Sequence, residues 1–405
     1  MFNVQSVRDD FPILSTLMND KPLIYLDNAA TSQKPLTVIK AVEDFYKTSN
    51  SNIHRGVFRL SELATARYEA TRKQFSEFIS AEKDSEIIFV KGVTEAINLI
   101  ASGFAQTIIK EGDEILISGM EHHANIVPWQ IACEQTGAIL KVIPVLDDGS
   151  LDLLAFEALL SEKTKLLSIV HISNSLGTIN PIKLMIDKAH ALDVPVLVDG
   201  AQSAPHMEVD VRDLDCDFYV FSGHKLFAPT GVGVLYGKEK WLEQLPPYQS
   251  GGDMIEKVDF DGTTFKGIPG KFEAGTPPIA PVIGFSSSLN FMKDVDPNVI
   301  YDHEMKLHDY AYEKLSKFNN IKIFGSNKNK GAIISFNIEG IHNSDLGAML
   351  DKKNIAIRTG HHCCQPLMKH LNVTGTSRIS FGVYNTKNDV DYLLDSIKEI
   401  TKILL

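Results

Sequence analysis

The sequence has few cysteines, no long apolar run and no surplus of basic residues. Four cysteines in 405 residues do not suggest a disulfide framework, so we expect a reducing, cytoplasmic environment. No apolar run approaches the roughly 18 residues that a membrane helix needs. The start, MFNVQSVRDDFPIL, lacks the basic and apolar regions of a signal peptide. We therefore expect no association with a membrane.

The charge balance and the missing nucleotide motifs exclude further classes. Lys and Arg number 40 against 51 Asp and Glu, a net charge of −11, which argues against a general nucleic-acid surface. No GxGxxG opens a strand–helix–strand unit, and no glycine-rich loop ends in GK[ST]. A nicotinamide dehydrogenase and a Walker-type phosphate site are therefore disfavoured.

Short apolar runs alternate with helical patterns through the first two thirds of the chain, after a long amphipathic helix over residues 61–80. We expect buried strands at residues 86–90, 113–118, 139–145, 165–173, 194–200 and 217–222. This alternation predicts an α/β fold with a mainly parallel sheet covered by helices on both faces.

The last third of the chain has a different texture. Segments 246–255, 262–272 and 274–281 are rich in Gly and Pro, and we expect ordered loops there. A smaller α+β domain follows, with strands expected at 321–325, 331–338, 354–358 and 377–382 and a closing helix at 389–404. We divide the chain into an N-terminal segment packing with the small domain (1–20), a large domain (21–292) and a small domain (293–405).

Polar residues follow the expected strands at the point where each strand ends. Because ligands of open α/β sheets bind beyond the carboxyl ends of the strands, these side chains should share one site. They are Thr94, Glu95, Glu121, His122, His123, Asn174, Asp199, Gln202, Ser222, His224 and Lys225.

Lys225, in the stretch SGHKLFAPTG, ends a strand whose burial disfavours a charged amine. Asp199 could be a helix cap or an ion-pair partner of Lys225. Alternatively, Asp199 holds a protonated pyridine nitrogen while Lys225 forms a Schiff base with an aldehyde on that ring. Thr94 at a helix start suits an anion, and His122 offers a flat ring for stacking. Together these groups suit pyridoxal phosphate.

Eight motifs carry a resemblance to a known family: YLDNAATSQKP, NIHRGVFRLSELAT, EHHANIVPWQ, HISNSLGTINPI, VDGAQSAPH, SGHKLFAPTGVGVLYG, FEAGTP and RTGHHCCQPLM. They resemble the group II (Suf-type) cysteine desulfurases, which are class V aminotransferase-like enzymes of pyridoxal phosphate fold type I. The resemblance covers essentially the whole chain. SGHK indicates only the superfamily, whereas RTGHHC narrows it to desulfurases and selenocysteine lyases.

The resemblance implies a role for each site residue in a homodimer with its active site at the interface. Lys225 carries the cofactor, Asp199 pairs with the pyridinium nitrogen, Gln202 hydrogen-bonds the ring 3′-oxygen, and His122 stacks on the ring and transfers protons. The phosphate is bound by Thr94, Ser222 and His224, with Thr276 from the other subunit. The substrate carboxylate is held by Asn174, Arg358 and Arg378.

Cys363 decides the reaction that the resemblance implies. Its thiolate attacks the sulfur of L-cysteine, which leaves L-alanine and a persulfide on the enzyme. A reactive thiolate needs cationic neighbours, and the candidates are Arg358, His361 and His362. The alternative interpretation of HHCC is a metal cluster, but four adjacent residues do not easily converge on one tetrahedral ion. We therefore expect no metal.

Several alternatives stay open at this point. Cys364 directly follows Cys363, where many relatives have a small residue without a thiol, so Cys363 need not carry the persulfide alone. The position within RTGHHC favours Cys363. Cys133 and Cys216 are expected to be buried. A selenocysteine lyase acting on L-selenocysteine, a transaminase-type enzyme and a non-catalytic assembly protein are the competing functions. The expected sulfur acceptor is a Suf-type relay or scaffold protein of iron–sulfur cluster assembly, and His54 and Arg55 receive no role.

Overall fold

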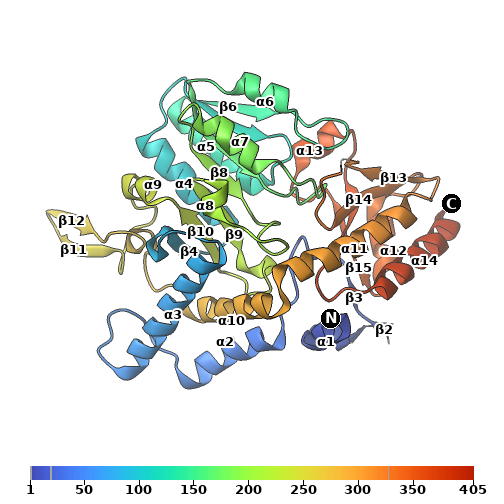
Figure 1. Ribbon diagram of the computed structural model, residues 1–405, viewed down its shortest axis with the longest axis horizontal. Coiled ribbons are helices and arrows are strands. Elements are labelled where there is room, and N and C mark those ends of the chain that lie inside the picture. The colour runs from blue at the N-terminus through green and yellow to red at the C-terminus, as the bar shows by residue number, and fades with distance from the viewer. Residues whose placement is uncertain (1, 19–20, 327) are drawn as a thin grey trace.

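One seven-stranded sheet forms the centre of the larger part of the molecule, which we call the large lobe (Figure 1). The computed structural model describes residues 2–18, 21–326 and 328–405. The strands are β4 (Ile87–Val90), β5 (Glu114–Ser118), β6 (Ile139–Ile143), β7 (Thr164–Val170), β8 (Val196–Asp199), β9 (Phe218–Ser222) and β10 (Gly233–Gly237). Their order is β4-β10-β9-β8-β7-β5-β6, and β5 to β9 are parallel. The mainly parallel α/β fold is confirmed.

Strand β10 is the part of this sheet that the sequence patterns did not predict. It runs antiparallel between β4 and β9. Its first residue, Gly233, lies so close to the turn between β4 and α4 (Val93–Thr107) that a Cβ there would come within 2.6 Å of the Gly92 Cα atom. The glycine therefore lets β10 pack against the turn that follows β4.

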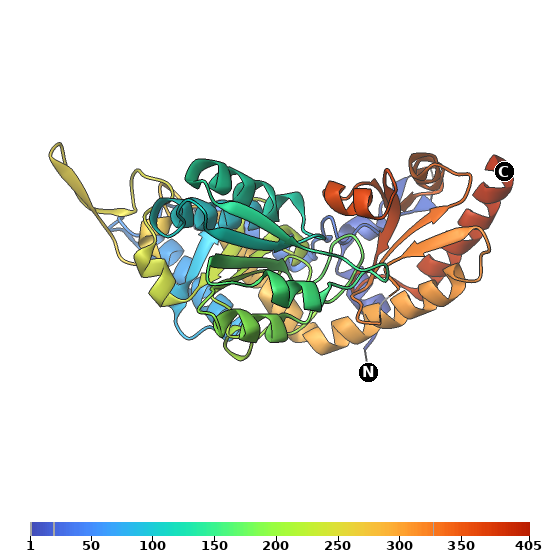
Figure 2. The same ribbon diagram turned by 90° about the horizontal axis from the view of Figure 1, so that it is seen from above.

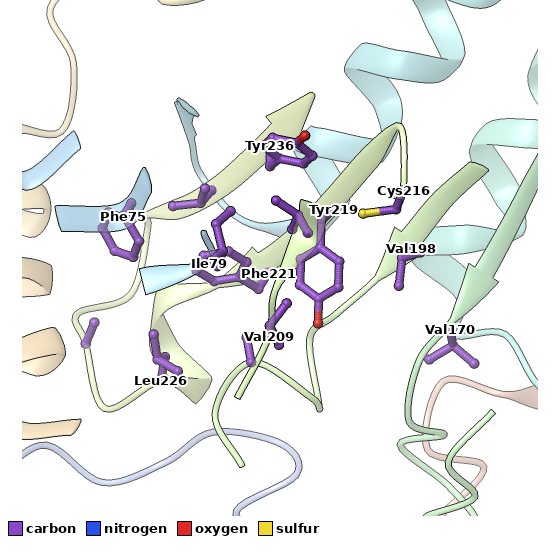
Figure 3. Packing of buried hydrophobic residues seen from close by; sticks show 14 of the residues in the cluster. Phe75, Ile79, Val170, Val198, Val209, Cys216, Tyr219, Phe221, Leu226 and Tyr236 are labelled. Atoms are coloured by element: carbon purple, nitrogen blue, oxygen red, sulfur yellow. The ribbon is translucent and has the colours of Figure 1, made fainter. Parts of the chain in front are cut away.

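Helices cover both faces of the sheet because successive strand residues face opposite sides. On β9, Phe218 and Val220 pack on one face, and Tyr219 and Phe221 pack on the other. Figure 3 shows the second face, where Phe75 approaches Phe221. The first face carries α4 (Val93–Thr107), α5 (Val127–Thr136) and α9 (Glu239–Gln244). The second carries α3 (Arg59–Phe78), α6 (Leu153–Leu159), α7 (Ile182–His190) and α10 (Ile279–Val295).

A four-stranded antiparallel sheet forms the small lobe, beside the large lobe in Figures 1 and 2. Its strands are β13 (Ile321–Phe324), β14 (Ile333–Ile338), β16 (Arg358–Gly360) and β17 (Thr376–Ser380), in the order β13-β14-β17-β16. Its helices are α11 (Pro297–Leu315), α12 (Asn343–Asp351), α13 (Gln365–His370) and α14 (Lys387–Leu404).

The N-terminal segment lies against the small lobe. β3 (Ile24–Tyr25) pairs in parallel with β15 (Ile355–Ala356), and Arg8 forms an ion pair of 3.2 Å with Asp389. The prediction of one strand over 354–358 was wrong, because β15 pairs with β3 while β16 pairs with β17. The remaining elements are α1 (Val4–Asp9), β1 (Leu17–Met18), β2 (Lys21–Pro22), α2 (Leu36–Thr48) and α8 (Val211–Leu214).

A hairpin projects from the large lobe where loops were expected. It consists of β11 (Ile255–Asp259) and β12 (Gly262–Phe265) and extends away from both lobes (Figures 1 and 2). Most of its residues are exposed, so no apolar alternation marks these strands in the sequence. The expected loop over 274–281 was too long as well, because α10 begins at Ile279.

Within the described part of the chain, no helix combines the length and the apolar character needed to cross a bilayer.

Candidate active site

A pocket lies where the carboxyl ends of the central strands meet β16 and β17 of the small lobe. Ten of the predicted site residues line it: Thr94, His122, Asn174, Asp199, Gln202, Ser222, His224, Lys225, Arg358 and Arg378. Residues more than 280 positions apart in the chain therefore share one site. Cys363 and Thr276 do not line the pocket. The prediction that every polar residue after a strand shares this site was wrong for Glu95, Glu121 and His123, which lie outside its lining.

Lys225 ends the short 3₁₀ turn Gly223–Lys225 that follows β9. Its amine forms no hydrogen bond or ion pair with any described residue, and the predicted alternative of an ion pair with Asp199 is absent there. Burial lowers the pKa of Lys225 to about 8, although the charge of Asp199 opposes this shift. About a tenth of the amine is therefore neutral at pH 7, far more than for an ordinary lysine, and this fraction can act as a nucleophile.

Asp199 and Gln202 lie behind Lys225, at and just after the end of β8. The Oδ1 atom of Asp199 accepts the Ala201 N–H at 2.9 Å. Burial raises the pKa of Asp199, and the Ala201 hydrogen bond and Lys225 oppose that shift. The Gln202 Nε2 atom donates to Ala29 O at 2.6 Å, whereas its buried Oε1 atom has no partner among the described residues. Both side chains have unused capacity to bind a polar ring.

The N-terminus of α4 opens onto the same pocket. Gly92 precedes the helix with a φ of 155°, and a Cβ there would lie 3.0 Å from Ser222 Oγ. That hydroxyl accepts the Val93 N–H at 2.9 Å. The first N–H groups of a helix lack intrahelical acceptors and favour an anion, and the Thr94 hydroxyl lies beside them. Burial lowers the pKa of His224 to about 4, so it would contact an anion as a neutral donor.

His122 follows β5 on another side of the pocket. Its Nδ1 atom accepts the Ala124 N–H at 3.1 Å. Burial, followed by the charge of Lys225, lowers the pKa of His122 to about 3. The ring is therefore neutral, and its proton lies on Nε2, because Nδ1 is an acceptor.

Two guanidinium groups form the small-lobe wall of the pocket. Arg358 on β16 and Arg378 on β17 are directly opposite each other in the ladder. The buried Arg378 donates to Asn174 O at 2.9 Å and to Asp27 Oδ1 at 2.7 Å, and its Nε atom has no partner in the described chain. Asp27 is the single carboxylate paired with this couple among the described residues. The wall therefore carries excess positive charge and suits a carboxylate.

These features fit pyridoxal phosphate. The unpartnered amine of Lys225 can attach its aldehyde, and the orphaned Gln202 Oε1 marks an amide that lacks a partner. Asp199 can stay ionised beside a protonated ring nitrogen, and the N-terminus of α4 can hold the phosphate.

The cysteine loop, residues 361–365, joins β16 to α13 next to the pocket. Cys363 is half-buried, and its Sγ atom lies 4.0 Å from Arg358 Nη2. Cys363 and His362 have φ angles of 57° and 51°, a left-handed conformation that costs about 1–2 kcal/mol for each such residue. The surrounding contacts must therefore hold this loop in place.

The prediction that His362 is a cationic neighbour of Cys363 was wrong. His362 is buried and its Nε2 atom hydrogen-bonds Thr376 Oγ1 at 2.8 Å. Burial, with the charges of Arg378 and Arg358, lowers the pKa of His362 to about 2, so its ring is neutral. Arg358 remains as a cation close to the thiol.

The other three thiols are in apolar or enclosed positions. Cys364 is buried, its S–H donates to Asn174 Oδ1 at 3.2 Å, and burial raises its pKa to about 12. Burial also raises the pKa values of Cys133 and Cys216, and both are buried as predicted. In the part of the chain that the structure describes, no group of three or more His, Cys, Asp or Glu residues could hold a metal ion.

Thr276 lies away from the pocket of its own chain. It lines a separate surface hollow with Arg55 and Asp253. His54 in the same region contacts Glu69 at 2.9 Å and Asp253 at 3.3 Å, and Arg55 lies 3.6 Å from Asp253. His54 and Arg55 therefore fix the loop around Asp253.

Two residues that contact the site were given no role from the sequence, and Glu121 was wrongly placed in the site. Asp27 was quoted in YLDNAAT but given no role, although it orients Arg378. His123 was noted only as a polar residue after a strand, yet it contacts the cysteine loop. Glu121, from the same set, is buried away from the pocket and accepts hydrogen bonds from Asn125 and Val170. Position after a strand does not separate these cases, because neighbouring residues point in different directions.

Comparisons with known proteins cover almost the whole chain. The model of the class-V aminotransferase family matches residues 24–393. The chain is 46% identical to a cysteine desulfurase of Escherichia coli over 405 residues, covering 100% of both chains. It is 48% identical to a probable cysteine desulfurase of Halalkalibacterium halodurans over 397 residues, covering 98% of each. The crystal structure of another E. coli cysteine desulfurase superposes with a TM-score of 0.93 at 39% identity, covering 100% of both chains.

Proposed function

Since the chain belongs to the class-V aminotransferase family and is a cysteine desulfurase that uses pyridoxal phosphate, we propose that Lys225 and Cys363 divide its reaction between them. Lys225 works inside the pocket, and Cys363 works from the loop beside it. The observation that carries this proposal is that Lys225 and Cys363 differ from other lysines and cysteines of the described chain. Lys225 is an unpartnered amine that lines the pocket, and Cys363 is half-exposed whereas the other three thiols are buried.

The cofactor is held by groups that the pocket already provides. Lys225 would be its attachment point, Asp199 would hold the ring nitrogen, and Gln202 would bind the ring oxygen. The N-terminus of α4 with Thr94, Ser222 and His224 would bind the phosphate. When bound, pyridoxal phosphate supplies an electron sink for the electron pair that remains when the substrate Cα loses its proton.

The substrate carboxylate binds to the arginine wall. Arg378 is pre-oriented by Asp27 and the Asn174 carbonyl, so little conformational freedom is lost when it grips a carboxylate. Arg358 adds a second positive charge. The Cα proton is taken up and returned by the Lys225 amine, whose lowered pKa leaves part of it neutral. The neutral His122 ring lines the same pocket and offers its Nε2 proton to the reacting groups.

Cys363 removes the sulfur. Its thiolate, stabilised by Arg358, bonds to the substrate sulfur while the substrate Cβ–S bond breaks. The electron pair of the broken bond stays with Cβ, which then takes up a proton. In sum, L-cysteine and the Cys363 thiol give L-alanine and a Cys363 persulfide, so all atoms are accounted for.

We further propose that the enzyme works as a homodimer and passes its persulfide sulfur to a protein acceptor that serves iron–sulfur cluster assembly. Thr276 does not reach the pocket of its own chain, which leaves it available to a second copy. The hairpin exposes the apolar side chains of Val258, Phe260 and Phe265, which form a surface suited to contact with a second copy of the chain. The half-exposed Cys363 is accessible to an acceptor.

Alanine release in a single turnover tests this division of work. A Cys363→Ala variant should keep the cofactor absorbance and release no alanine from L-cysteine, because the sulfur has no acceptor thiol. Wild-type release of one alanine per active site is the reference. Alanine release by the variant at the wild-type rate would show that another group removes the sulfur.

A further inference from the structure

His123 contacts the cysteine loop at two points of its main chain. The His123 N–H donates to Cys363 O at 2.8 Å, and the Gln365 N–H donates to His123 Nε2 at 3.1 Å. The two loop residues flank Cys364, so His123 spans the segment that carries the nucleophile. His123 belongs to the large lobe, in the turn after β5, whereas the loop belongs to the small lobe.

Asn174 holds the same loop from another element of the large lobe. Its Nδ2 atom donates to His362 O at 2.8 Å, and its Oδ1 atom accepts the Cys364 S–H at 3.2 Å. Each of the four consecutive residues 362–365 therefore has one hydrogen bond to the large lobe. Of these two residues, Asn174 also lines the cofactor pocket, whereas His123 does not.

On the proposed role of Cys363 as nucleophile, we propose that His123 is a positioning residue that docks the cysteine loop onto the large lobe for the attack on the substrate sulfur. Two consecutive residues of that loop, His362 and Cys363, are left-handed, and such a backbone persists only where neighbouring contacts fix it. His123 supplies two of those contacts.

The ring of His123 is suited to accept the loop hydrogen bond. Acceptance of the Gln365 N–H requires a lone pair on Nε2, which the neutral ring provides. Burial, together with the nearby His361, lowers the pKa of His123 and favours that neutral form. The His361 ring lies 5.6 Å away at an angle of 34°, so it packs beside the ring that docks the loop.

Two complementary variants separate the ring from its acceptor. His123→Phe keeps the ring and loses the Nε2 acceptor, whereas His123→Gln loses the ring and keeps an acceptor at the end of the side chain. Because His123 is only half-buried, both should fold. His370→Gln is the matched control, since His370 is an exposed histidine in the helix that follows the loop.

Steady-state kinetics and hydrogen–deuterium exchange of the holoenzymes provide the readouts. For His123→Phe we expect kcat to fall about 3- to 10-fold with KM changed less than about twofold, since one hydrogen bond is lost outside the substrate pocket. The peptide covering residues 361–366 should exchange faster. His123→Gln should restore both values, and His370→Gln should match the wild type.

Unchanged kcat and unchanged exchange in His123→Phe would overturn the docking role. A failure of His123→Gln to restore either value would also overturn it, because the acceptor would then not be the important feature. Exchange is measured without substrate, so it reports on the docking even if wild-type enzyme released no alanine. That last result would overturn the proposed function instead.

Discussion

The pocket and the cysteine loop hold their reactive groups in opposite ways. Lys225 lies at the end of a buried strand of a seven-stranded sheet, in surroundings built from backbone and packed side chains. Cys363 lies on a half-exposed loop that few hydrogen bonds hold in a left-handed conformation. An amine that anchors a cofactor benefits from rigidity, whereas a thiol that receives sulfur and gives it away must be able to leave its position.

The loss of Lys225 should have the largest effect. Lys225→Ala should reduce turnover on the order of 10⁴-fold, because covalent catalysis through the cofactor is lost. Lys330→Ala is the matched control, since burial lowers the pKa of Lys330 to about 8 as well, but its amine donates to Leu176 O and does not line the pocket. Turnover of L-cysteine measures both. A smaller loss in Lys225→Ala than in Lys330→Ala would contradict the assignment.

Replacing the guanidinium at the pocket wall should come next. Arg378→Lys should raise KM for L-cysteine about 10- to 100-fold, because a lysine cannot reproduce the fork that Asp27 and Asn174 orient. Initial-rate kinetics measure the change. The same substitution at Arg358, which is not held in this way, should affect KM less. A larger increase in KM for Arg358→Lys than for Arg378→Lys would show that Arg358 is the main partner of the substrate carboxylate.

The pH dependence of cofactor attachment should show the effect of burial on Lys225. The pKa of about 8 lies below the ordinary lysine value, so the fraction of Lys225 with a neutral amine increases as the pH rises through 8. Between pH 7 and pH 9 its fraction increases roughly tenfold. The rate at which cofactor-free enzyme binds pyridoxal phosphate, followed by absorbance, should rise by the same factor. An increase of about 100-fold over this range would contradict the account, because it is the increase expected of an amine that keeps the ordinary lysine pKa.

The smallest effect on the fold should come from the hairpin. Phe260→Ser should change the free energy of unfolding by less than about 0.5 kcal/mol, because this side chain is fully exposed in the single chain. Under the homodimer proposal the same variant should shift sedimentation toward the monomer. Leu154→Ser, at an exposed apolar residue of α6 outside the hollow that Thr276 lines, is the control. Equal sedimentation of both variants and the wild type would remove the hairpin from the interface.

The pocket could be predicted from the sequence because its residues follow buried parallel strands. Thr94, Asp199 and Lys225 all stand at strand ends or helix starts, and the carboxyl ends of parallel strands converge at one edge. Strand periodicity therefore led directly to the pocket. The same reasoning missed β10. This five-residue strand begins and ends with glycine, and no helical pattern separates it from β9.

The cysteine loop and the hairpin could not be worked out in the same way. The neutrality of His362 follows from its burial against Thr376, which no local pattern encodes. The contacts of His123 and Asp27 join residues more than 200 positions apart. The hairpin strands face solvent on both sides and so lack the apolar alternation by which strands are found.

A peptide map of sulfur on the holoenzyme tests the comparison most directly. After incubation with L-cysteine and no acceptor, the account predicts one extra sulfur atom on Cys363, with Cys364 unmodified because its thiol is buried and its pKa is raised. A persulfide on Cys364, or none on either cysteine while alanine is released, would contradict the assignment of the exposed loop thiol as the sulfur carrier.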